Sequence, residues 1–127
     1  MTGYSSGIDA TLRRDAAKAR DRAMRLLHEG LGLTEAQIVS LNVGDVHVER
    51  WTITPRRPRS KARTVAELDK ASARALGKWL TFRGLLKQGD GHAGEPVFIS
   101  LHWSAAYRRP LGRLSVRACY NVVSAVD

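Results

Sequence analysis

The chain has 127 residues, 43% of them hydrophobic and only 6% aromatic, which suits one domain with a core of aliphatic side chains. Its formal net charge is +9, from 21 Lys and Arg against 12 Asp and Glu, so nucleic acid is the first candidate partner. The single cysteine, Cys119, excludes an internal disulfide and a metal site built from thiolates.

Residues 1–10 are rich in Gly and Ser and predict a flexible lead-in to a single domain over residues 11–127. The lead-in lacks the apolar segment of a signal peptide, and no run of 18 apolar residues follows that would span a membrane. We therefore expect a cytoplasmic protein, nucleoid-associated if the cell is bacterial, with no membrane partner.

Two helices are predicted in the first third of the chain. Over residues 9–31, Ala and Leu recur at steps of three and four, and Gly30 and Gly32 are expected to end this helix. Thr34 followed by Gln37 has the spacing of a capping box. It predicts a short second helix over residues 34–41 that buries Ile38 and Leu41.

Three strands are predicted next. Residues 43–54 alternate β-branched and polar side chains around Glu49-Arg50, which indicates a hairpin with a tight turn, and residues 64–68 predict a third strand. The loop between the second and third strands holds five cations, no acid, and two prolines that limit its flexibility. These cations are Arg56, Arg57, Arg59, Lys61 and Arg63. We expect them to contact phosphates, which supplies affinity but does not read sequence.

Asp69 predicts the N-cap of a helix reaching about Leu86, with Leu76 and Trp79 in its apolar stripe. A Gly-rich loop over residues 88–95 follows. The apolar residues 96–101 then fit either a strand or an extended segment buried in the core. The predicted fold class is α+β, with helices packed on a small three-stranded antiparallel sheet.

A second basic segment precedes the last helix. Arg108, Arg109 and Arg113 are expected to form a loop, and Ser115 caps a helix whose apolar side chains are Val116, Tyr120, Val123 and Val126. Arg117 lies in the first turn of that helix, where the helix dipole favours acids; this fits a role with an anionic ligand, and solvent could equally accommodate the charge. These four arginines complete the predicted nucleic-acid contacts.

Other chemistry is not indicated. The four histidines, His28, His47, His92 and His102, have no metal-ligand spacing, so we expect no metal and no cofactor. Cys119 lies among apolar residues and predicts a core position rather than a nucleophile. The three tryptophans are interpreted as core anchors, although Trp103, in the second basic loop, could stack on a base.

The order of these elements, together with several short strings, resembles the catalytic domain of tyrosine recombinases, the phage-integrase family. The resemblance covers about residues 15–126 and predicts a fold like the N-terminal part of that domain. The strings that carry it are Gly32-Leu33-Thr34 with Glu35, Leu41 and Asp45 following, Lys61-Ala62-Arg63-Thr64-Val65, Val97-Phe98-Ile99-Ser100, and Leu114-Ser115 before a helix containing Tyr120.

The departures from the family pattern bear on chemistry. The resemblance implies two arginines, one or two histidines and a lysine around a scissile phosphate that a tyrosine attacks. Here Thr34 stands at the first arginine position, Gln37 at the acidic position and Pro58 near the lysine position. The chain ends at Asp127, before the family's His-x-x-Arg segment and nucleophile, and Tyr120 does not match that nucleophile. We therefore expect no catalytic residues and no enzyme activity.

The function predicted from the sequence is that of a DNA-binding protein resembling an inactive, shortened integrase, which regulates or accompanies recombination of a mobile element. The missing later helices would leave an apolar face, so a homo-oligomer, most simply a dimer, is expected. Two alternatives remain open. One is a fragment of an active integrase, and the other is a module that keeps the fold but binds another protein or RNA.

Overall fold

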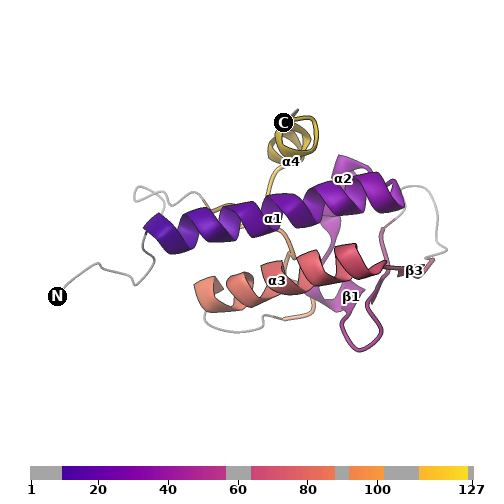
Figure 1. The fold of residues 1–127 in the computed structure, drawn as a ribbon. Coiled ribbons are helices and arrows are strands. Elements are labelled where there is room, and N and C mark those ends of the chain that lie inside the picture. The colour runs from indigo at the N-terminus through magenta and orange to yellow at the C-terminus, as the bar shows by residue number, and fades with distance from the viewer. Residues whose placement is uncertain (1–9, 57–63, 88–91, 102–111, 126–127) are drawn as a thin grey trace.

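The computed structural model describes residues 10–56, 64–87, 92–101 and 112–125 (Figure 1). The helices are α1 (Ala10–Leu31), α2 (Glu35–Ser40), α3 (Lys70–Lys87) and α4 (Val116–Val123), and a 3-10 helix, η1 (Val43–Asp45), follows α2. The strands are β1 (Val46–His47), β2 (Thr52–Ile53) and β3 (Ala66–Glu67). Four helices with a small three-stranded antiparallel sheet confirm the predicted α+β class.

Capping side chains define the helix ends where the sequence predicted them. Gly32 ends α1 in the left-handed region, at a φ of 69°. Thr34 and Gln37 form the capping box of α2. Thr34 Oγ1 accepts from the backbone N–H of Gln37 at 3.1 Å, and Gln37 Oε1 accepts from the backbone N–H of Thr34 at 3.0 Å. Asp69 Oδ1 accepts from the Ser72 amide at 2.7 Å at the start of α3, and Ser115 Oγ caps α4.

The sheet has the order β1-β2-β3, with Ile53 of the central strand opposite both Val46 and Ala66. Its strands are shorter than predicted. Residues 43–45 form η1 instead of a strand. The Asp45 carboxylate accepts a hydrogen bond from the backbone N–H of Asn42 at 2.9 Å, which stabilises a turn. Residues 48–51 form the hairpin turn, wider than the predicted two residues, and it closes with Trp51 at a φ of 50°.

The core lies beneath α1 and α3, which run side by side in Figure 1. Small side chains of α1, such as Ala16 and Ala23, let the helices approach closely. The Trp79 and Phe98 rings stack at 6.4 Å, and Trp79 Nε1 donates to the Val97 carbonyl at 2.9 Å. Residues 96–101 form no regular strand: the segment is largely buried, as expected, but it bends at Val97 and Phe98 between isolated bridges at Pro96 and Ile99.

α4 packs differently from the prediction. Cys119 is fully buried, as expected of a core cysteine, but Val116 and Tyr120 are about half exposed, at 49% and 51%. The helix lies across α1 (Figure 1) and also packs against α2; its covered side holds Cys119 with the partly buried Ala118, Val122 and Val123. Arg25 of α1 holds its far end by donating to the Val122 carbonyl at 3.3 Å.

Candidate nucleic-acid interface

Three of the nine arginines and lysines predicted to contact nucleic acid lie within the described residues: Arg56, Arg113 and Arg117. Arg56 is the one described cation of the first basic loop, and Arg113 is the one described cation of the second. The other six predicted contacts lie outside the described residues. They are Arg57, Arg59, Lys61, Arg63, Arg108 and Arg109.

Arg113 is fixed against the end of α2. Its Nη1 donates to the Val39 carbonyl at 2.7 Å and approaches the Leu41 carbonyl at 3.5 Å, and its Nη2 donates to Asn42 Oδ1 at 2.6 Å. The final carbonyls of a helix carry partial negative charge and lack intrahelical partners, so a guanidinium stabilises them. Arg113 therefore has a structural function at α2, beyond the phosphate contact predicted for it.

Arg56 reaches the same segment from the other side. Its Nε lies 3.9 Å from Asp45 Oδ2, and the same oxygen accepts a hydrogen bond from the backbone N–H of Asn42 at 2.9 Å. A chain of polar contacts thus runs from Arg56 through Asp45 and Asn42 to Arg113. We call Arg56, Asp45, Asn42 and Arg113 the loop-root cluster, because their contacts hold one described end of each basic segment. The sequence prediction found no acid within the first basic segment, and Asp45, eleven residues upstream, supplies one.

The capping box of α2 adjoins this cluster. Gln37 Nε2 donates to the Arg56 carbonyl at 3.2 Å, while its Oε1 accepts from the Thr34 amide. Thr34 and Gln37 are the positions at which the recombinase resemblance expects an arginine and an acid. In this structure an uncharged pair occupies them, and it links the start of α2 to the first basic segment.

Arg117 is exposed in the first turn of α4, as the sequence predicted. It makes no ion pair with any other described residue. Arg117 does not belong to the loop-root cluster. Of the three described candidates, it is the one whose guanidinium has no ion pair or hydrogen bond to another described residue.

A second group of cations was not singled out in the sequence. Lys18 and Arg22 of α1, together with Arg74 and Lys78 of α3, line a groove between these two helices. Both pairs are spaced four residues apart, which places each pair on one side of its helix. The spacing was visible in the sequence, but only the packing of α1 against α3 makes the two pairs face each other.

Neither metal nor thiol chemistry is indicated in the part of the chain that the structure describes. No group of three His, Cys, Asp or Glu side chains there could hold a metal ion. Burial raises the pKa of the Cys119 thiol to about 11, so it stays protonated at neutral pH and is a poor nucleophile. Nor is any described helix long and apolar enough to cross a membrane.

Comparison of the chain with protein-family models, with curated proteins and with solved structures finds no match. The α+β class and the positions of these cations are therefore the basis for a functional assignment.

Proposed function

We propose that this chain is a DNA-binding protein that performs no covalent chemistry and resembles an inactive tyrosine recombinase. In this proposal it regulates or accompanies site-specific recombination of a mobile element. The observation that carries the proposal is the loop-root cluster. Arg56 and Arg113, the described residues that border or belong to the two basic segments, both contact residues 42–45.

Two basic segments rooted at one place favour a shared ligand. Residues 57–63 hold four cations and no acid, and Arg108 and Arg109 add two more from the second segment. Arg56 and Arg113 hold one described end of each segment against residues 42–45, and positive charges near one point reinforce each other's electrostatic potential. A polyanion such as the DNA backbone gains most from this arrangement, because every neutralised phosphate releases counterions.

The proposed absence of catalysis has its own support. Thr34 and Gln37 are hydrogen-bonded to each other, so their side chains cap α2 at the position where the resemblance expects a phosphate-binding arginine. A neutral hydroxyl and amide cannot stabilise charge that grows on a phosphoryl oxygen as a guanidinium does. The element order, with the small sheet between α2 and α3, is consistent with that resemblance.

The proposal includes self-association through α4. Val116 and Tyr120 are one helical turn apart and about half exposed, so they form a small apolar face. A second copy of the chain is the simplest partner for such a face, since a twofold contact would cover both copies at once.

The test is titration of a fluorescently labelled DNA duplex with the full chain, followed by anisotropy at several salt concentrations. We expect binding at low salt that weakens steeply between about 50 and 200 mM. The variant Arg57→Gln/Arg59→Gln/Lys61→Gln/Arg63→Gln should lower the slope of log K against log salt by about 3.6, or 0.9 for each lost phosphate contact.

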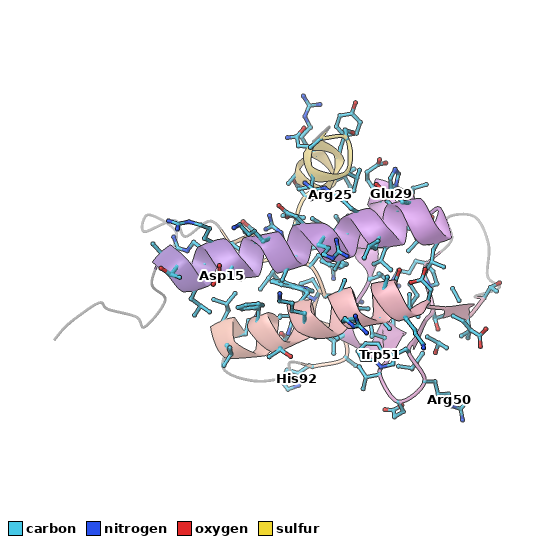
Figure 2. The ribbon with its side chains drawn as sticks, viewed as in Figure 1. Asp15, Arg25, Glu29, Arg50, Trp51 and His92 are labelled. Atoms are coloured by element: carbon cyan, nitrogen blue, oxygen red, sulfur yellow. The ribbon has the colours of Figure 1, made fainter. Side chains whose placement is uncertain are left out.

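Arg50→Gln is the control, because Arg50 is exposed in the hairpin turn (Figure 2) and belongs to neither basic segment. It should change the slope much less than one phosphate contact would. Absence of binding at the lowest salt would refute the proposal, as would a wild-type slope in the loop variant. A covalent protein–DNA adduct on a denaturing gel would favour the active-integrase alternative.

A further inference from the structure

A groove runs between α1 and α3, the two helices that lie side by side in Figure 1. Its volume is about 550 Å³, and its described walls come from these two helices only. The helices run in opposite directions, with α1 starting at the left of the view and α3 ending there. Asp15 marks the end of the groove at which α1 begins (Figure 2).

The sides of the groove are basic. Lys18 and Arg22 lie on one side, Arg74 and Lys78 on the other, and all four residues are exposed. None of them forms an ion pair with another described residue. Each pair is spaced four residues apart, or about 6 Å along its helix axis. The two sides therefore hold four cations over little more than one helical turn, against the single carboxylate of Asp15 at one end.

The floor of the groove is apolar. Ala19 and Ala75 contribute only methyl groups, and Phe82 lies toward the Asp15 end. Such a floor offers no hydrogen bonds with which to recognise a ligand, so recognition falls to the charges on the two sides. A ligand with regularly repeated negative charge fits these sides better than a small anion, which needs converging donors in an enclosed site.

We propose that this groove is a second DNA-binding surface, in which one strand of a duplex places its phosphates between Lys18–Arg22 and Arg74–Lys78. The inference rests on the proposed DNA binding and adds a site to it. The groove shares no residue with the loop-root cluster, whose four residues all lie outside α1 and α3. The two surfaces therefore contribute to affinity independently.

Asp15 gives the proposal a directional test. It is exposed, lines the groove and makes no ion pair with another described residue. A carboxylate in a phosphate-binding groove repels the backbone, so its removal should strengthen binding. An increase in affinity cannot result from a misfolded variant, which makes Asp15→Asn informative where neutralised cations alone would not be.

The experiment uses the labelled duplex and the full chain. In the groove variant Lys18→Gln/Arg22→Gln/Arg74→Gln/Lys78→Gln, we expect the salt slope to fall by about 3.6 and the Kd at low salt to rise more than tenfold. The charge-preserving variant Lys18→Arg/Arg22→Lys/Arg74→Lys/Lys78→Arg should bind like the wild type. Asp15→Asn should bind severalfold more tightly at low salt.

Combining the groove and loop variants separates this inference from the proposed function. Independent surfaces predict that their losses in binding free energy add. If the wild type binds DNA and the groove variant keeps its slope, the groove is not a DNA surface and the proposed function stands. If the wild type binds no DNA at low salt, both fail. An Asp15→Asn variant that binds no more tightly than the wild type also counts against the groove.

Discussion

The loop-root cluster and the α1–α3 groove both contain cations, but only the cations of the cluster have described partners within the protein. In the cluster, Arg113 donates to the Val39 carbonyl and to Asn42, and Arg56 lies beside Asp45. In the groove, neither Arg22 nor Arg74 pairs with any described acid. In the cluster the positive charge contacts acceptors within the protein, whereas the groove cations form no ion pair with a described residue.

This difference shows that charge density along a sequence does not identify the available cations. Arg113 was grouped with Arg108 and Arg109 because they lie close together in the chain, yet its guanidinium has acceptors within the protein. Lys18 and Arg74 stand 56 positions apart and still line one groove. Substitutions that separate stability from binding can therefore distinguish the two kinds of cation.

The largest effect on stability is expected from Arg113→Ala. Because the substitution leaves the carbonyls at the end of α2 and the Asn42 amide oxygen without their charged donor, we expect it to cost about 2 kcal/mol of unfolding free energy. Urea denaturation followed by circular dichroism measures this cost.

Arg74→Ala in the groove is the matched control, since it removes the same side chain from a site without a described ion pair. Exposed substitutions of this kind usually change stability by less than about 0.5 kcal/mol. Equal losses in the two variants would contradict the distinction between structural and available cations.

The parts of the fold that could be predicted from sequence are those fixed by local chemistry. Gly32, the Thr34–Gln37 capping box and the Asp69 cap each depend on residues within a few positions of one another, and all three were predicted. The strands were overestimated for a related reason. The alternation of residues 43–54 favours a hairpin, but Asn42 and Asp45 form a competing local turn that the alternation does not reveal.

Contacts between distant residues could not be predicted in this way. Arg113 is 74 positions from Val39, and Arg25 is 97 positions from Val122. The partial exposure of Val116 and Tyr120 also depends on how α4 lies across α1, which no property of α4 alone determines. The groove belongs to the same category, because the helical spacing of its cations predicts one charged side per helix but not which helix lies opposite.

A smaller loss is expected from Thr34→Ala, which removes the N-cap of α2. Thr34 Oγ1 accepts from the Gln37 amide at 3.1 Å, and loss of such a cap costs about 1 kcal/mol. The effect should extend to the cluster, because Gln37 also donates to the Arg56 carbonyl. Thr34→Ser, which keeps the hydroxyl, should retain most of the stability, and both are measured by urea denaturation. A loss as large in Thr34→Ser would show that packing of the methyl group, not capping, is responsible.

The smallest effect is the pH dependence of the Asp69 cap, which begins α3, one of the two helices that line the groove. The Ser72 amide and hydroxyl donate to the Asp69 carboxylate, and these bonds lower the pKa of Asp69 from its ordinary value of 3.8. Because the pKa is lower in the folded state, the stabilisation of α3 is fully present above pH 3.8 and is lost as the pH falls through the folded value.

Asp69→Asn separates the cap from its charge, because an asparagine side chain also caps a helix but does not titrate in this range. The difference in unfolding free energy between wild type and Asp69→Asn should stay constant above about pH 5 and shrink below about pH 4. Urea midpoints measured across that range test this expectation. A difference that stays constant down to the lowest pH would mean that the Asp69 charge does not stabilise the first turn of α3, the turn that leads to Arg74 in the wall of the groove.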